Sequence, residues 1–224
     1  MAISRGPKIV TDGLVLALDA ADKNSYPGTG TTWTDLSGNA NNGTLTNGPT
    51  FSGDNGGSIV FDGVDDYINI LNNSSFNVTD NISVEIWVRI ETTQSNNLGF
   101  LIKYANGYLF YIVGVNNTFA FDSRNGDGTY YRTTGTTNIK DGVWKYLVGQ
   151  KSGLSYKVYV NGVLEGSTTA NSVGSIAGNV NLKLGTDDGT YLNGRIATFK
   201  IYNRALSATE VLQNYNSTKS RFGL

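Results

Sequence analysis

Apolar side chains recur at every second position along much of this sequence, and this period restricts the fold more than any other feature. Four clear examples are the sets Leu14/Leu16/Leu18, Val84/Ile86/Val88/Ile90, Leu109/Tyr111/Val113 and Tyr156/Val158/Val160. Successive side chains of a β-strand point to opposite faces of a sheet, so period two predicts strands with one buried face. We therefore expect an all-β protein.

Turn signals separate these runs. Asn-Gly dipeptides stand at residues 106–107, 161–162 and 193–194. Asn and Gly tolerate the positive φ angles of two-residue hairpin turns, so consecutive strands are expected to pair antiparallel. The chain also holds 28 glycines and only 3 prolines. This pattern is typical of an antiparallel β-sandwich and not of alternating α/β units.

One segment departs from period two. In residues 207–219, Ser207 and Glu210 have the spacing of a capping box, and Val211, Leu212 and Tyr215 share one helical face. The sequence predicts a short C-terminal helix packed on the sandwich.

Length and charge indicate one domain. A chain of 224 residues with 39% hydrophobic content can bury one sizeable core, which we place in residues 12–224. Residues 1–11 are expected to form an N-terminal arm or an edge strand. The 17 basic and 18 acidic residues are spread without long runs, which disfavours a nucleic-acid partner. No apolar run is long enough for membrane insertion or for a secretory signal.

The chain contains neither cysteine nor histidine. Disulfides, zinc-thiolate sites and catalytic centres of the Ser-His-Asp or Cys-His type are therefore excluded. Carboxylate, amide, hydroxyl and aromatic groups remain, and these groups suit a hard cation or a sugar.

Residues 35–43 resemble a cation-binding loop in their spacing. Asp35, Ser37, Asn39 and Asn41 place oxygen-bearing side chains at every second position, although the bidentate Glu of an EF-hand is missing. A structural Ca²⁺ is one interpretation. The other is that Asp, Asn and Gly gather here because turns require them.

Tyrosines beside polar turns are candidates for carbohydrate binding, because a flat ring can stack on a sugar. Tyr130 and Tyr131 follow the turn that contains Asp127, and Tyr191 follows a second acidic turn. Because Tyr130 and Tyr131 are adjacent, they should face opposite sides of a sheet, and at most one should lie in the core.

Five stretches, in this order, resemble a laminin G-like jelly roll of the concanavalin A-like lectin/glucanase superfamily. They are Gly-Leu-Val-Leu-Ala-Leu-Asp (13–19), Trp-Thr-Asp-Leu-Ser-Gly-Asn (33–39) with Asn-Gly-Thr-Leu (42–45), the strand–acidic turn–strand segment 58–70, Tyr-Val-Asn-Gly-Val-Leu (159–164), and 192–207. The resemblance implies a jelly-roll sandwich over nearly the whole chain. It also implies a structural Ca²⁺ at loop acids, either in residues 35–41, at the turn that begins with Asp62, or at Asp187 and Asp188.

The glucanase branch of this superfamily carries Glu-x-Asp-x-x-Glu on one strand. Here the sequence around Glu85 reads Glu-Ile-Trp-Val-Arg-Ile-Glu, with Trp87 at the Asp position and Glu91 six residues on. The motif is absent, and we predict a protein that is not an enzyme.

The favoured interpretation is a non-catalytic binding or structural module on a larger assembly. Residues 5–16 resemble the start of small family members in marine phages, which implies a virion-surface protein made in the host cytoplasm. Its partners would be other virion proteins in an oligomeric assembly, and cell-surface or environmental glycans. The alternative is a carbohydrate-binding module, or a glycoside hydrolase-related domain, of a secreted bacterial protein with an extracellular location.

Overall fold

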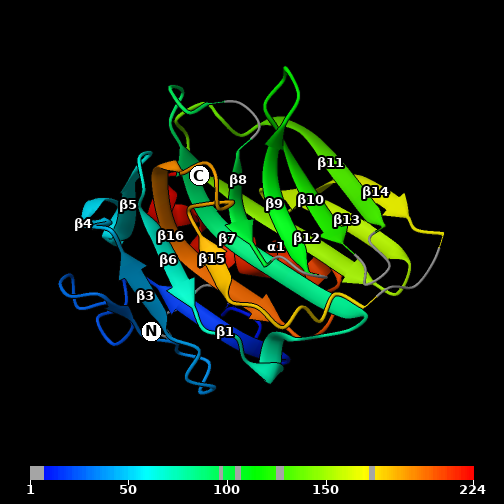
Figure 1. The fold of residues 1–224 in the computed structure, drawn as a ribbon, viewed down its shortest axis with the longest axis horizontal. Helices are drawn as coiled ribbons and strands as arrows, with labels where there is room; N and C mark the ends of the chain where they lie inside the picture. The colour runs from blue at the N-terminus through cyan, green and yellow to red at the C-terminus, as the bar shows by residue number, and fades with distance from the viewer. Residues whose placement is uncertain (1–7, 96–97, 104–106, 125–128, 172–174) are drawn as a thin grey trace, which may run out of the picture.

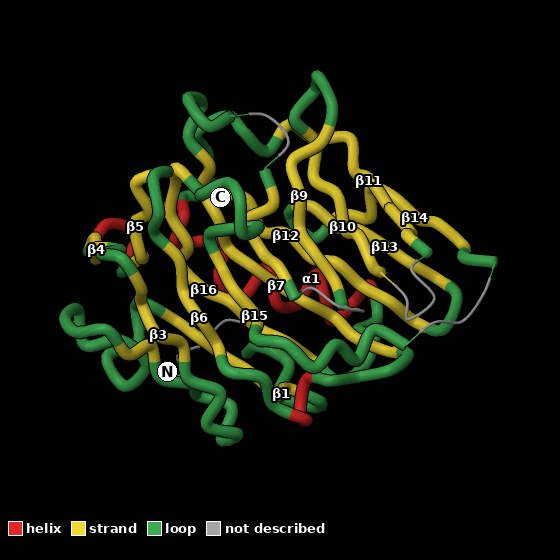
Figure 2. The backbone as a smooth tube through the Cα atoms, viewed as in Figure 1, coloured by secondary structure: helices red, strands yellow, loops and turns green. Residues whose placement is uncertain are grey.

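The computed structural model describes residues 8–95, 98–103, 107–124, 129–171 and 175–224. Within these residues, sixteen strands form two eight-stranded antiparallel sheets that pack face to face (Figure 1). The predicted antiparallel jelly-roll sandwich with one C-terminal helix is confirmed, and Figure 2 shows how little of the chain is helical.

Sheet A has the strand order β14-β13-β12-β7-β16-β5-β4, and β1 pairs with β16 beside this path. Its strands are β1 (Leu14–Asp19), β4 (Thr50–Ser52), β5 (Ser58–Asp62), β7 (Asn81–Ile90), β12 (Lys145–Ser152), β13 (Ser155–Val160), β14 (Val163–Thr169) and β16 (Asn193–Tyr202).

Sheet B has the order β11-β10-β9-β8-β15-β6-β3-β2. Its strands are β2 (Thr32–Trp33), β3 (Gly43–Thr46), β6 (Tyr67–Ile70), β8 (Gly99–Ile102), β9 (Tyr108–Val113), β10 (Thr118–Arg124), β11 (Tyr130–Asn138) and β15 (Leu182–Leu184). Three 3₁₀ helices, η1 (Asp54–Gly56), η2 (Ser74–Phe76) and η3 (Lys219–Phe222), and one α-helix, α1 (Ala208–Thr218), complete the described elements. None of the described helices has both the length and the apolar character needed to cross a membrane.

The main core lies between the two sheets. It takes every second side chain from each, such as Ile68 and Ile70 from β6 and Ile59 and Phe61 from β5. Val60 alternates with two buried neighbours, Ile59 and Phe61, so it points to the other side of sheet A although it is an apolar residue.

The segment 58–70 does contain two strands, but they do not pair with each other. β5 lies in sheet A and β6 in sheet B, so the acidic turn between them connects the two layers. Asn161 and Gly162, with φ of 50° and 81°, form the predicted hairpin turn between β13 and β14. Asn193-Gly194 is not a turn: Gly194 lies inside β16, where an added Cβ would come within 2.3 Å of the Arg89 carbonyl oxygen. The third predicted turn, at 106–107, is only partly within the described residues.

A second apolar cluster covers the outward side of sheet A. Helix α1 lies behind the sandwich in Figure 1, and Trp87 stacks on Phe222 with ring centroids 4.1 Å apart. The capping box of Ser207 and Glu210 is confirmed. Leu212 was expected on the packed face of α1 but is 44% exposed, and buried Asn214 takes that place.

Residues 8–11 form no strand and lie against α1. The Val10 amide donates to Asn214 Oδ1 at 2.7 Å, and the Tyr202 hydroxyl donates to the Val10 carbonyl at 3.0 Å. The chain before residue 8, where an arm was expected, lies outside the described residues.

Candidate functional site

No described α-helix lies on the outward side of sheet B, so this face is the main candidate for a binding surface. We call it the outer face. Residues such as Phe110, Phe121 and Leu182 point into the core, so their neighbours in each strand point outward. The outward residues that we use to define the outer face are Thr44, Tyr67, Asn69, Ile102, Tyr111, Asp122, Tyr130, Arg132 and Lys183.

The structure separates the two adjacent tyrosines as predicted. Tyr131 packs on the core and stacks on Tyr156 at 5.7 Å, whereas Tyr130 lies on the outer face and is 53% exposed. Beside Tyr130, the Arg132 guanidinium forms a two-point ion pair with the buried carboxylate of Asp122. Only the register of β10 with β11 brings this pair together, so period two alone could not identify it.

A hollow of about 320 Å³ opens on the outer face. It is lined by Ile102, Val180, Asn181, Lys183 and Asp188. Lys183 Nζ forms an ion pair with Asp188 and lies 5.4 Å from the centre of the Tyr67 ring. We call this the first hollow. Of its residues only Asp188 was predicted from the sequence, and that prediction was for a metal.

The other predicted sugar-binding residues do not gather at one point. Tyr191 is half-buried and forms a bridge with Thr186, next to the turn that holds Asp187 and Asp188. Tyr130 lies on β11, four strand positions from β15, which corresponds to about 19 Å across the sheet. Asp127 lies outside the described residues.

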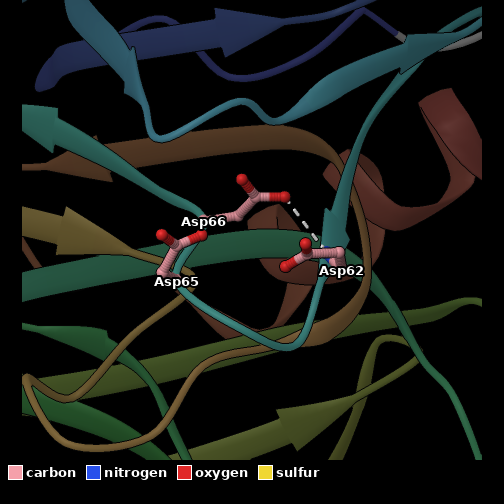
Figure 3. Close-up of side chains that lie close together, drawn as sticks. All are labelled: Asp62, Asp65 and Asp66. Atoms are coloured by element: carbon pink, nitrogen blue, oxygen red, sulfur yellow. Dashed lines mark hydrogen bonds between the residues drawn. The ribbon is translucent and has the colours of Figure 1, made fainter.

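The acidic turn between β5 and β6 gathers three carboxylates. Oxygens of Asp62, Asp65 and Asp66 lie within 4.8 Å of one another (Figure 3). Asp66 is buried and accepts a hydrogen bond from the Asp62 amide at 3.1 Å. Burial, and then the charges of Asp62 and Asp65, raise the pKa of Asp66 above its ordinary value. A bound cation would relieve this repulsion, so the residues present fit a hard cation such as Ca²⁺.

The predicted loop around Asp35 has a different arrangement. The buried Asp35 carboxylate accepts four hydrogen bonds, from the Ala17, Ser37 and Asn41 amides and from the Ser37 hydroxyl. Asn39 donates its side-chain amide to the Val15 carbonyl at 3.2 Å. These contacts are those of a carboxylate that organises a turn.

The Asp187 carboxylate is likewise used by hydrogen bonds, most of them from its own turn. Its carboxylate accepts from the Gly189 and Thr190 amides, from the Thr190 hydroxyl and from the Gly99 amide. Among the predicted metal ligands, Asp62 is therefore the one whose surroundings, with Asp65 and Asp66, best suit a cation.

The four glutamates all have structural contacts. Glu85 is buried under α1 and accepts from Asn214 at 2.8 Å, and burial raises its pKa. Glu165 on β14 accepts hydrogen bonds from the Thr136 and Thr137 backbone amides of β11. These bonds connect an edge strand of sheet A to an edge strand of sheet B. Glu210 caps α1, and Glu91 pairs with Arg89 at 3.2 Å.

The sequence matches the family described as the concanavalin A-like lectin/glucanases superfamily over residues 62–212, more than half of the chain. The chain belongs to this superfamily. No curated protein sequence matches it.

Several solved structures share this superfamily fold. One is the binding domain of Paraclostridial Mosquitocidal Protein 1, with a TM-score of 0.74, 19% identity and coverage of 92% of this chain and 52% of that chain. Another is the binding domain of Botulinum Neurotoxin DC in complex with SialylT, with a TM-score of 0.76, 17% identity and coverage of 93% and 52%. This chain spans about half the length of these toxin binding domains.

A third similar structure matches over nearly its whole length. It is domain 4 of AbnA, a GH43 extracellular arabinanase from Geobacillus stearothermophilus, in complex with arabinotriose. The TM-score is 0.71 at 21% identity, with coverage of 90% of this chain and 98% of that chain. At these identities the likeness establishes the fold.

Proposed function

We propose that this domain is a non-catalytic carbohydrate-binding module that binds glycans on its outer face. The observation that carries the proposal is the first hollow, which combines an apolar floor with polar groups at its rim. Ile102 and Val180 offer apolar contact to the C–H face of a sugar ring. Lys183, Asp188 and Asn181 offer donors and acceptors to its hydroxyls.

Two further observations support a binding role. Domain 4 of AbnA and the Botulinum Neurotoxin DC binding domain were solved with arabinotriose and SialylT, respectively. Each of the four glutamates here is occupied by a cap, an ion pair or buried hydrogen bonds, which disfavours a pair of carboxylates acting on a glycosidic bond.

The test is binding to a glycan array, followed by titration calorimetry with the glycans that bind. The variant Lys183→Ala should weaken binding by about tenfold or more, the equivalent of one or two lost hydrogen bonds. Lys157→Ala, on β13 of sheet A, is the matched control and should bind as the unmodified protein does. Absence of glycan binding, or equal effects of the two variants, would refute the proposal.

We further propose that Asp62, Asp65 and Asp66 hold a structural Ca²⁺. The location on a virion surface, with other virion proteins as partners, rests on the N-terminal resemblance alone. Its test is detection of the protein in purified particles, and its alternative is an extracellular bacterial protein.

A further inference from the structure

A second hollow opens beside the first, at the ends of β6 and β3. Its volume is about 360 Å³, and the residues that line it are Ala40, Asn41, Asn42, Thr44, Leu71, Asn72 and Asn73. None of these side chains carries a charge, and four of them are amides. Leu71, which is 68% exposed, adds an apolar surface.

Asn41, which lines this second hollow, has a side-chain oxygen without a hydrogen-bond donor. Its side-chain nitrogen donates to the Val15 carbonyl at 2.7 Å and to the Ser75 hydroxyl at 2.8 Å, which fixes the orientation of the amide. The residue is only 3% exposed, and no described residue donates to its Oδ1. A buried amide oxygen without a donor is costly, and a hydroxyl that reached it from the hollow would satisfy it.

Asparagines connect the two hollows. The backbone N–H of Asn72, in the second hollow, donates to Asn181 Oδ1 of the first at 3.0 Å, and the Asn181 side-chain nitrogen donates to Asn69 Oδ1 on the outer face at 3.2 Å. The buried ammonium of Lys103 binds Asn72 Oδ1 and the Val180 carbonyl, and so holds both walls in place. The first hollow lies at β8 and β15 and the second at β6 and β3, about two strand spacings or roughly 10 Å apart.

From this arrangement we infer that the two hollows are subsites for one linear, uncharged oligosaccharide, which spans the asparagines between them. This inference rests on the proposed glycan-binding function and specifies its ligand class. A neutral ligand is favoured because no lining residue of the second hollow is charged, and Lys183 and Asp188 of the first form an ion pair. The Lys103 ammonium behind the walls lines neither hollow and is held by the Asn72 and Val180 oxygens. An oligosaccharide is favoured because one sugar ring cannot reach both hollows.

The experiment measures affinity against chain length. Arabino-, xylo- and cello-oligosaccharides of one to six units, and sialylated and uronic-acid oligosaccharides as charged probes, are titrated into the unmodified protein and two variants. Leu71→Arg fills the second hollow from an exposed position. Val115→Arg, at a 92% exposed position between β9 and β10, is the matched control.

For one neutral series, affinity should rise by at least about tenfold from the shortest ligand that binds to the longest, the equivalent of one or two added hydrogen bonds. Leu71→Arg should remove this rise and leave the shortest ligand unaffected, whereas Val115→Arg should retain it. Two results with the unmodified protein would overturn the inference: an affinity that does not depend on ligand length, or binding of charged glycans alone. Two results with Leu71→Arg would also overturn it: an equal loss of affinity at every length, or no loss of affinity at all. In all four cases glycans still bind, so the proposed function would stand. Failure of every glycan to bind would instead refute the proposed function.

Discussion

At the scale of single residues, Asp66 is a carboxylate whose surroundings oppose its charge. Its folded-state pKa is raised, so the stability that it contributes is full below its unfolded pKa and is lost as pH rises through the folded value. At neutral pH without a cation, Asp66→Asn should therefore be at least as stable as the unmodified protein. Thermal unfolding in EDTA checks this.

With calcium present, the unmodified protein should be more stable than Asp66→Asn. A ligand bound only by the folded state adds about 2.7 kcal/mol at a hundredfold excess over its dissociation constant, and Asp66→Asn should lose this gain. Asp35→Asn is the contrasting variant, because its lost hydrogen bonds should lower the melting temperature equally with and without calcium. An unchanged transition in EDTA, with no metal by elemental analysis, would exclude the site.

Lys103 is a second residue with an unusual environment, since its ammonium is fully buried. Burial lowers its pKa to about 8. Between that value and its unfolded value the unfolded chain binds the extra proton, so Lys103 makes the free energy of unfolding rise with pH.

Urea unfolding from pH 7 to 10 tests this prediction. The free energy of unfolding of the unmodified protein should rise relative to that of Lys103→Met across this range, and this rise should exceed any change relative to the control Lys157→Met, on β13. If the free energy of unfolding of the unmodified protein, relative to Lys103→Met, falls or stays constant as pH rises, the oxygen acceptors around Lys103 stabilise its charged form more than burial destabilises it.

At the scale of elements, α1 protects the second apolar cluster. Ser207→Ala removes the N-cap and should lower stability by about 1 kcal/mol in urea unfolding at pH 7. The Arg204 guanidinium, which donates to Glu210, holds the pKa of that carboxyl at about 2. The contribution of Glu210 is present above its unfolded pKa and is lost as pH falls toward 2.

The cost of Ser207→Ala should therefore shrink below pH 3, where the capping box is weakened in both proteins. Thr209→Ala, an exposed position in the first turn of α1, should change stability little at either pH. Equal losses in the two variants would point to general helix propensity and not to the cap.

At the scale of the whole molecule, we expect glycan binding without turnover. Incubation with β-glucans, galactans, arabinans and alginates should release no reducing sugar. Glu91→Gln should bind glycans unchanged, because Glu91 pairs with Arg89 at the end of β7, in sheet A, and not on the outer face. Measurable turnover that disappears in any single Glu→Gln or Asp→Asn variant would contradict the non-catalytic assignment.

Local physical chemistry was sufficient for much of the fold. Period two identified the strands, Asn161-Gly162 identified a hairpin, and the capping box located α1, because each signal acts between residues close in sequence. In β9 the choice of face was wrong: Tyr108, Phe110 and Ile112 lie in the core, and the set Leu109/Tyr111/Val113 points outward. The acidic turn was also visible, since its carboxylates lie within five residues.

Only the tertiary structure decided which sheet each strand joins and which residues meet. The sequence pattern did not predict that β5 and β6 lie in different sheets. Nor did it predict that Asn214, and not Leu212, is buried under α1. The first hollow joins Ile102 to Lys183 through the pairing of β8 with β15, and the second joins Asn41 to Asn72. Strand pairing between distant segments is selected by burial of the whole core, and a shift of one residue in β8 or β15 would turn Ile102 or Lys183 to the opposite face.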